Sequence, residues 1–284
     1  MEIKTIAHKI SSHWILLCFL FIGSVTQVKS QLVMGPPQGM KLTYEQEALG
    51  KASMECIYLY KRTNAKKQSE SMRLILQANN NLSKCYSLAK YRIDSVANLN
   101  GRNRMKPADF QKILNSYSER SIGDNLCFNS REYRDLKKST ITSVVYEFGP
   151  TSLEYATTLP AVRWKTDYKD RRTICGYTCR KATGTLGGRN WTVWYSTDIP
   201  ISSGPWKLGD LPGLILQAAD STGEHSFEAV SIRNSKKTIF LDKFRTQKTT
   251  ALKVLEMSRE KYTSPSKYDV GFGVIVPQYS LLEK

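Results

Sequence analysis

Apolar and polar residues alternate with a period of two along much of the chain. The clearest runs put an apolar side chain at every second position: Met54, Cys56, Tyr58 and Tyr60 in the first, then Met72, Leu74 and Leu76 in the second. Alternation of this kind is typical of a β-strand with one buried face. We therefore predict two strands over these runs and a third over residues 82–93, after the turn-like 79–81.

Strand patterns return in the second half of the chain. We predict strands at 140–148, 151–157 and 238–244, with hairpins at 173–197 and 213–233. The first hairpin turns at Gly187-Gly188, because glycine supplies the positive φ that a tight turn requires. The second turns at residues 220–223, where Asp, Ser, Thr and Gly follow one another.

Two segments have helical rather than strand spacing. In 107–117 the apolar residues fall three or four apart, and Pro107 suits a first helical turn. In 248–262 the expected apolar face comprises Ala251, Leu252, Leu255 and Tyr262. We predict a short inserted helix at the first segment and a C-terminal helix at the second.

These elements predict a mainly β (α+β) fold. Many short strands with two helices indicate a single antiparallel sheet that is curved, or a partly closed barrel. No repeat, low-complexity tract or linker divides the chain. We predict one β-rich domain over residues 31–284, preceded by a signal peptide at 1–30.

The prediction of export rests on the N-terminal pattern. Lys4 and Lys9 precede a short apolar run from Trp14 to Ile22, and small and polar residues follow up to Ser30. This is the layout of a cleaved signal peptide, since a membrane-spanning helix needs about 20 apolar residues. Cys18 lies inside the apolar run, so we expect no lipid anchor there. We predict a periplasmic or extracellular protein, with association with the outer membrane left open.

The net charge limits the classes of binding partner that we expect. The formal net charge of +17 favours anionic lipid headgroups, acidic glycans or an acidic protein. The basic residues are scattered and no nucleic-acid-binding motif accompanies them, so nucleic acid is excluded as the expected partner. The simplest interpretation is a solvated basic surface. The oligomeric state stays open.

Cysteine use follows from the predicted export. Five cysteines lie beyond residue 30, at positions 56, 85, 127, 175 and 179, and one or two disulfides are plausible in an oxidising compartment. Cys175 and Cys179 have the spacing C-x3-C. On one strand these residues are too far apart to bond, although a turn at Gly176 would bring them together. We interpret both as structural cysteines.

Few residues suit catalysis. His225 is the only histidine beyond residue 30, which excludes histidine-rich metal sites, and we expect it to be an ordinary surface residue at a hairpin. The carboxylates Asp198, Asp210, Asp220 and Glu224 lie in or near predicted loops, but their spacing selects no pair. We predict no catalytic residue, no metal and no cofactor.

The densest information lies in residues 190–216. The candidate ligand-binding, partner-binding or loop-shaping residues here are Trp191, Trp194, Tyr195, Gly204, Pro205, Trp206, Leu211, Pro212 and Gly213. Prolines and glycines would give the connection a fixed shape that could line a binding site. The simpler interpretation is that the aromatics pack the core. We expect Trp206 to anchor residues 199–213 and its neighbour Lys207 to be dispensable for stability.

The order of residues across this stretch resembles a known family. The features are Trp194-Tyr195, Thr197-Asp198-Ile199-Pro200, Gly204-Pro205-Trp206 and Leu211-Pro212-Gly213-Leu214-Ile215. They resemble the defining motif of the GLPGLI family, exported proteins best represented in Bacteroidetes. Asp210 replaces the first glycine of that motif, so position 210 needs no positive φ or aspartate tolerates it. The resemblance implies envelope location and a β-rich fold, and carries over no active site.

Three functional hypotheses follow. The main one is a non-enzymatic envelope protein that binds an apolar or amphipathic, lipid-like ligand or an envelope partner. The second is an accessory of outer-membrane uptake machinery that binds an outer-membrane or periplasmic protein. The third is a hydrolase that uses a carboxylate pair or His225. An open apolar groove would favour the first hypothesis, and two carboxylates facing each other in a cleft would favour the third.

Overall fold

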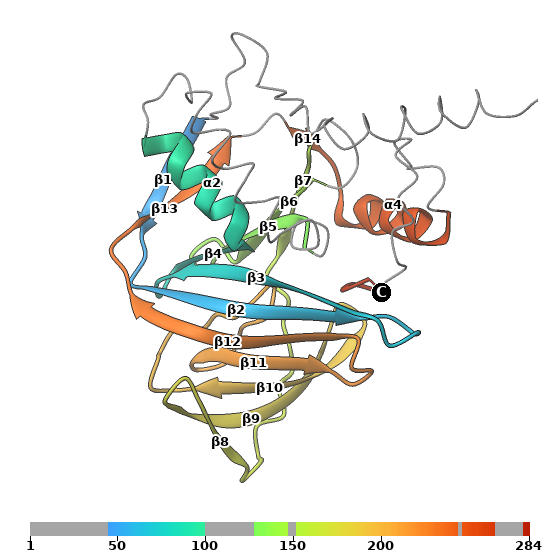
Figure 1. Cartoon of the computed structure of the whole chain (residues 1–284). Coiled ribbons are helices and arrows are strands. Elements are labelled where there is room, and N and C mark those ends of the chain that lie inside the picture. Colours follow the sequence, from blue (N-terminus) through green and yellow to red (C-terminus); the bar gives the residue numbers. More distant parts are fainter. Residues whose placement is uncertain (1–44, 100–127, 147–151, 244–245, 265–280) are drawn as a thin grey trace, which may run out of the picture. The chain divides into compact units, whose positions relative to one another are not determined.

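A large curved β-sheet organises the protein (Figure 1). The computed structural model describes residues 45–99, 128–146, 152–243, 246–264 and 281–284. These residues belong to one unit, Lys41–Lys284. The sheet has twelve strands in the order β14-β7-β6-β5-β4-β3-β2-β12-β11-β10-β9-β8.

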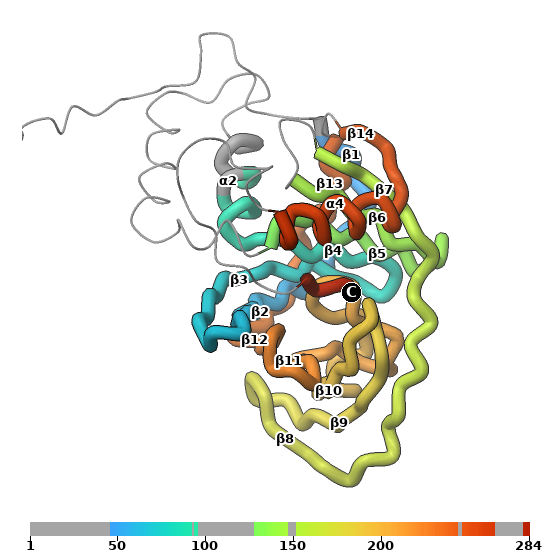
Figure 2. The backbone as a smooth tube through the Cα atoms, turned by 90° about the vertical axis from the view of Figure 1, so that its right-hand side faces the viewer, coloured from blue at the N-terminus to red at the C-terminus, as the bar shows by residue number. Residues whose placement is uncertain are grey.

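Two consecutive meanders make up this sheet. The first contains β2 (Met54–Thr63), β3 (Ser69–Ala78), β4 (Leu82–Ser87), β5 (Ser130–Asp135), β6 (Thr140–Val145) and β7 (Ser152–Thr158). The second contains β8 (Arg171–Ile174), β9 (Tyr177–Leu186), β10 (Arg189–Ser196), β11 (Leu214–Asp220) and β12 (His225–Asn234). Antiparallel pairing of β2 with β12 joins the two meanders into one sheet. In Figure 2 the connection from β7 to β8 runs along one side of the sheet.

Smaller elements complete the fold. β1 (Glu45–Lys51) pairs with β13 (Thr238–Lys243) as a separate two-stranded sheet. β14 (Thr246–Lys248) adds to the large sheet as a parallel neighbour of β7. The helix α2 (Leu88–Leu99) contacts β3 and β4, and α4 (Ala251–Thr263) contacts β7.

The connection from β10 to β11, residues 197–213, packs against the first meander. The hydroxyls of Ser203 in the connection and Ser83 on β4 lie 2.9 Å apart, and directly after the connection the Ile215 carbonyl of β11 accepts from the Tyr58 hydroxyl of β2 at 2.7 Å. The backbone N–H of Trp206 points to the Cys85 sulfur at 3.3 Å. Residues of this connection therefore pack into the largest apolar cluster of the described residues, together with residues of the strands.

The predicted fold class is confirmed: the protein is mainly β, with a large curved sheet that does not close, and the described residues include two helices. The alternating residues of the first two runs are all buried on β2 and β3. Gly187 and Gly188 have φ values of 61° and 72°, so the predicted turn forms as expected.

One predicted strand is only half correct. Residues 82–87 form β4, but 88–99 form helix α2 rather than a continuation of the strand. The physical reason is local: Ala89, Lys90 and Arg92 favour a helix, and the Ser87 hydroxyl accepts from the Lys90 N–H at 3.5 Å, as a residue at a helix N-terminus does. The helix predicted at 107–117 lies outside the described residues.

The C-terminal helix is confirmed, but its predicted face is wrong. Val254 is the buried residue of α4 and packs with Val145, Leu153 and Tyr155, while Ala251 and Met257 flank it. Leu252 and Tyr262, assigned to the buried face, are 64 % and 38 % exposed. Leu252 lies two positions from Val254, about 200° around the helix, so it points away from the sheet.

The described cysteines 56, 85, 175 and 179 carry free thiols, so the expected disulfides do not involve two of these residues. The turn predicted at Gly176 forms, with φ values of 50° at Cys175 and 82° at Gly176. Cys175 and Cys179 are nevertheless not bonded to each other. Cys127 lies outside the described residues. Within the ranges that the structure describes, no helix is long and apolar enough to cross a membrane.

Candidate functional site

Two hairpin turns bring a group of charged side chains together. Arg189 opens β10 after the Gly187-Gly188 turn, and Asp220 closes β11 before the turn at 221–223. Arg189 Nη1 donates to Asp220 Oδ2 at 2.5 Å and to Glu224 Oε2 at 2.9 Å. We call the residues Arg189, Asp220, Thr222, Glu224 and His225 the Arg189 cluster.

Asp220 is the buried anion of the Arg189 cluster. Burial alone would raise the pKa of its carboxyl. Hydrogen bonds from the Thr222 hydroxyl at 2.5 Å, the His225 N–H at 3.0 Å and Arg189 outweigh this effect and lower the pKa. Asp220 is therefore a carboxylate near neutral pH and cannot donate a proton to a leaving group.

His225 is buried, with 1 % of its surface exposed, so the prediction of a surface histidine was wrong. Its Nδ1 lies 2.8 Å from the Tyr60 hydroxyl, and the two rings are parallel with centroids 6.0 Å apart. Burial and the nearby Arg189 lower the pKa of His225 to about 4. The ring is therefore neutral at pH 7.

Glu224 differs from Asp220 in its access to solvent, since 29 % of its side chain is exposed. Asp220 and Glu224 both accept from Arg189 Nη1, at 2.5 Å and 2.9 Å. The two accepting oxygens therefore lie no farther apart than the sum of these distances. This upper limit places the two carboxylates close enough to act as a pair, as the carboxyl groups of retaining glycosidases do at about 5 Å. The spacing of the acids along the sequence did not identify this pair. Folding brings Asp220 and Glu224 together at Arg189.

A second charged group lies under the 197–213 connection, where Glu132 and Lys207 are buried and 32 % of the Glu283 side chain is exposed. Burial raises the pKa of Glu132, which accepts from the hydroxyls of Ser130 and Ser143. Nearby Lys207 is also buried, donates to the Tyr155 hydroxyl at 2.9 Å and pairs with Glu283. Lys207 is therefore part of a buried charge network, and the expectation that it is dispensable is not supported by its environment.

A third group lies between the sheet and β13. Asp242 accepts from Lys84 at 2.6 Å, from the Tyr133 hydroxyl at 2.9 Å and from Arg131. Burial lowers the pKa of Lys84 to about 8, although Asp242 opposes this shift. The ionised side chains of Asp242, Lys84 and Arg131 are all buried, so the group ties β13 to the sheet rather than offering a site to a ligand.

The residues singled out in 190–216 build the interior. Trp191, Tyr195, Trp206 and Leu211 are buried in the largest apolar cluster, Gly204, Pro205 and Gly213 are also buried, Trp194 is half-buried, and Pro212 is exposed. A Cβ at Gly213 would lie 2.0 Å from the Ser196 carbonyl oxygen, so only glycine fits there. Asp210 has a φ of 63°, which shows that aspartate adopts the positive φ at this position. A binding role for these residues stays a prediction.

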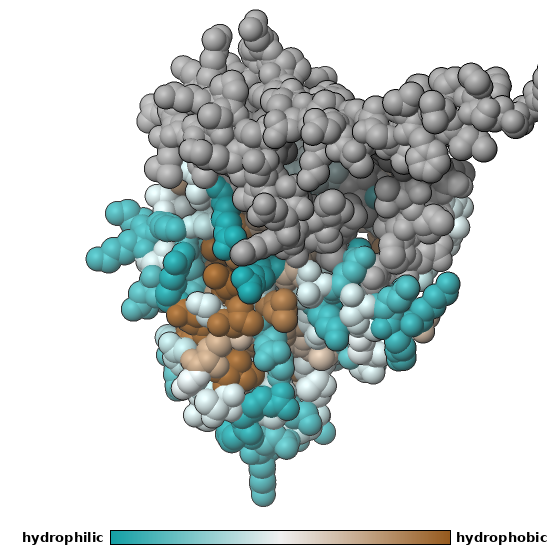
Figure 3. Space-filling view, in the orientation of Figure 1, coloured by the Kyte–Doolittle hydropathy of each residue, from teal (hydrophilic) through white to brown (hydrophobic). Residues whose placement is uncertain are grey.

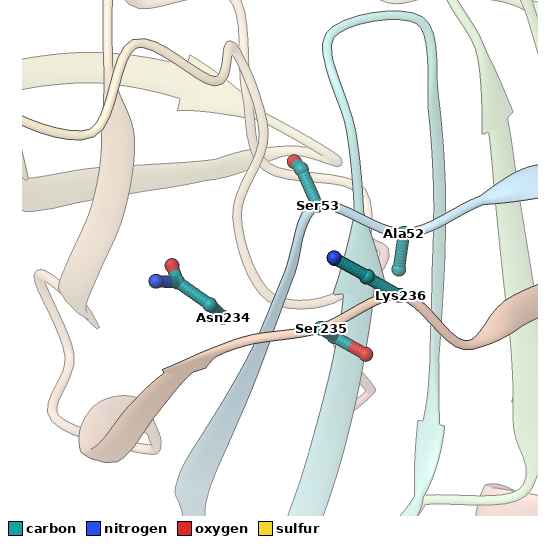
Figure 4. Close-up of a pocket in the computed structure, with 5 residues that line it drawn as sticks. All are labelled: Ala52, Ser53, Asn234, Ser235 and Lys236. Atoms are coloured by element: carbon teal, nitrogen blue, oxygen red, sulfur yellow. The ribbon is translucent and has the colours of Figure 1, made fainter.

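One open hollow lies at the junction of the two sheets. Its volume is about 540 Å³, and it is lined by Ala52, Ser53, Asn234, Ser235 and Lys236 (Figure 4). These lining residues include no acid, histidine or cysteine, and Lys236 is their only ionisable side chain. Within the described part of the chain, no three or more His, Cys, Asp or Glu side chains are grouped to hold a metal ion.

Comparisons with known proteins point to one enzyme class. Residues 165–258 match a family described as N-glycanase peptide, N-terminal domain. The matched segment contains the whole Arg189 cluster and is shorter than half of the chain. No curated protein matches the sequence.

One solved structure of PNGF-II shares the fold. The structure in space group P21 has 16 % identity and a TM-score of 0.50, and the match covers 72 % of this chain and 33 % of that chain. The structure in space group C2 also has 16 % identity, with 75 % and 33 % covered and a TM-score of 0.48. The chain thus spans about a third of the length of the PNGF-II structures that it matches.

The assignment to the GLPGLI family was wrong. The family model that matches describes an N-glycanase domain, and it covers the same stretch, 190–216, on which the resemblance rested. The order of aromatics, prolines and glycines there is explained by the buried connection that those residues form. The interpretation as a non-enzymatic envelope protein falls with it, and the hydrolase alternative agrees better with the comparisons.

Proposed function

We propose that this chain acts in the hydrolytic removal of N-linked glycans from glycoproteins. The observation that carries the proposal is the match of residues 165–258 to the N-terminal domain of an N-glycanase. The fold shared with PNGF-II agrees with it. The matched segment also contains the carboxylate pair that a hydrolase needs.

The proposed reaction breaks the amide bond between the asparagine side chain and the first sugar. Water supplies the hydroxyl that completes an aspartate on the peptide, and the amide nitrogen leaves with the sugar as a glycosylamine. Glu224 is the candidate general base that takes a proton from this water and passes it to the leaving amide nitrogen, because it is the carboxylate of the Arg189 cluster that reaches solvent. Arg189 and Asp220 are positioning residues that hold Glu224 in place.

A second candidate function is recognition of the glycoprotein for a hydrolase whose reacting groups lie elsewhere. One observation favours it: the chain spans only about a third of the length of PNGF-II. The electrostatics of the Arg189 cluster also suit it, since the low pKa of Asp220 leaves no buried proton donor beside Glu224. Both candidates belong to N-glycan removal and differ in where the bond is broken.

Glycan release from a purified N-glycosylated glycoprotein tests the proposal. We expect the chain to release glycans that mass spectrometry detects, and Glu224→Gln to lower the rate by about 100-fold or more, as loss of a general base does. The matched control is Glu228→Gln, an exposed glutamate of β12, the strand that begins directly after Glu224, and this variant should keep the full rate. No release, combined with binding of the glycoprotein, would leave recognition as the function.

Export agrees with such a function, because N-linked glycans occur on proteins outside the cytoplasm. The signal peptide at 1–30 lies outside the described residues and stays a prediction. The intact mass of the exported protein should show loss of about 24–30 residues. The proposed envelope partner is likewise untested.

A further inference from the structure

A strongly basic surface lies at the β8 edge of the large sheet. Residues 163–181, which span β8 and the start of β9, include seven lysines and arginines and two aspartates. All of these charged side chains are exposed except Lys181, which is half-buried. Figure 3 shows hydrophilic side chains at the lower end of the described part, where Figure 1 places β8 and β9. The function proposed above makes no use of this surface.

Aromatic rings lie among these charges. Trp194 of β10 faces Lys181 of β9 and Gln217 of β11 across the sheet, so the three share one face. The Arg172 guanidinium lies over the Trp194 ring, 4.4 Å from its centroid, and donates to Gln217. A guanidinium held over an indole can present its edge as a planar row of donors, which matches a carboxylate or sulfate.

Tyr168 extends the same surface. Its hydroxyl lies 2.9 Å from the Thr183 hydroxyl of β9, which fixes the ring against the strand. The ammonium groups of Lys181 and Lys165 lie 4.8 Å and 5.6 Å from the ring centroid. Lys181 thus connects Tyr168 with Trp194, and we call Tyr168, Arg172, Lys181, Trp194 and Gln217 the basic aromatic surface.

The acids nearby neutralise this surface only weakly. Asp170 lies 3.9 Å from Lys181, and Asp167 lies 4.0 Å from Lys165, with both acids more than half exposed. Solvent-exposed ion pairs contribute little to stability, about 0–1 kcal/mol, so a ligand anion can replace these carboxylates at small cost. The surface is therefore complementary to a negatively charged ligand.

We propose that the basic aromatic surface binds an anionic oligosaccharide. The C–H groups of a pyranose ring pack against aromatic rings such as Tyr168 and Trp194, while its carboxylate or sulfate pairs with Arg172 and Lys181. The choice of a carbohydrate rests on the proposed function. Trp194 lies five positions along β10 from Arg189, about 16 Å at 3.3 Å per residue, so this is a site separate from the Arg189 cluster.

Calorimetric titration with a hyaluronan tetrasaccharide, with neutral chitotetraose as the comparison, tests the proposal. We expect the acidic tetrasaccharide to bind at least about tenfold more tightly, and its affinity to fall as salt is raised. Arg172→Ala and Trp194→Ala should each weaken binding by about tenfold. Arg172→Lys keeps the charge but not the planar stack, so it should restore only part of the affinity.

Matched controls are Lys61→Ala and Arg73→Ala, which remove exposed cations of β2 and β3 outside this surface. These variants should bind as the unaltered chain does. Equal affinity for the neutral and acidic sugars, or an equal loss in the control variants, would overturn the proposal. Binding to phosphatidylglycerol vesicles that Arg172→Ala abolishes, without any binding of hyaluronan, would also overturn it.

The two proposals fail separately. Hyaluronan binding by a chain that releases no N-glycans would refute hydrolysis and leave the basic aromatic surface as proposed. Glycan release by Glu224 in a chain that does not bind hyaluronan would refute the anionic site alone.

Discussion

The two halves of the large sheet are stabilised in different ways. In the apolar region, β9–β12 with the connection 197–213, buried side chains are mostly hydrocarbon, and Trp191 lies 6.0 Å from both Trp206 and Phe227 between ring centroids. In the charged region, β4–β6 with β13, four consecutive residues of β5 are buried and three of them, Arg131, Glu132 and Arg134, carry ionisable groups.

The strands of the two regions are buried by different kinds of side chain: hydrocarbon in one and paired charges in the other. The apolar region gains stability from burial of hydrocarbon, which does not depend on pH. In the charged region, β5 is covered on both faces: Arg131 and Tyr133 meet Asp242 on one, and Arg134 meets Asp210 and the Lys207 carbonyl on the other. Buried charges contribute only while each keeps its partner, so this region is the more sensitive to single substitutions.

The largest expected effect is therefore in the charged region. Asp242→Ala leaves the buried Lys84 and Arg131 without their shared carboxylate and should lower the free energy of unfolding by about 3–5 kcal/mol. Denaturant unfolding measures this. Glu47→Ala removes an exposed partner of Lys243 on the paired strand β1 and should cost far less, because solvent screens an exposed ion pair. Similar losses in both variants would remove the distinction between buried and exposed pairs.

In the apolar region the matching variant is Trp206→Ala. Trp206 is 4 % exposed and packs on Trp191, so truncation should cost about 3–5 kcal/mol by opening a cavity under the 197–213 connection. The same change at Trp194, which is half-buried on the outer face, should cost clearly less. An unchanged unfolding midpoint for Trp206→Ala would show that the connection does not depend on this side chain.

The apolar region also holds one group of ionisable side chains, the Arg189 cluster, which should make part of its stability depend on pH. The native pKa of His225, about 4, lies below its ordinary value of 6.5, so its contribution to stability is complete above pH 6.5 and is lost as the pH falls towards 4. The loss should approach about 3 kcal/mol. In His225→Gln, which cannot titrate, the free energy of unfolding should vary much less over this range. A variant that keeps the full slope would assign it to other groups.

The smallest effect concerns helix α4. Val254→Ala should cost about 1–2 kcal/mol, since it removes buried methyl groups that pack on β7. Leu252→Ala, two positions earlier and 64 % exposed, should change stability by less than about 0.5 kcal/mol. A larger loss of stability for Leu252→Ala than for Val254→Ala would instead support the helix face predicted from the sequence.

The contrast between the apolar and the charged region also explains which strands could be predicted from the sequence. Alternation identified β2 and β3 because Tyr58 and Leu74 face one apolar interior. It could not describe β5, where Arg131 and Tyr133 point to one covered face and Glu132 and Arg134 to the other. A strand with charges on two buried faces has no hydrophobic alternation to detect.

The candidate site was hidden for a different reason. Arg189, Asp220 and Glu224 are ordinary hairpin residues in sequence, and β11 and β12 must first pair before their side chains meet. The aromatics of 190–216 drew attention because of their density, yet most of them are core residues. His225 was read as exposed since it follows a turn, although pairing with Arg62 on β2 buries it beside Tyr60.

Hydrolysis of an N-glycosylated peptide in ¹⁸O-labelled water tests the proposed function most directly. If the chain breaks the amide bond, mass spectrometry should show an aspartate at the former glycosylation site, with one ¹⁸O atom in its carboxyl group, and Glu224→Gln should abolish the labelled product. A peptide recovered with its glycan intact, or with ¹⁸O only in a released sugar, would contradict amide hydrolysis by this chain.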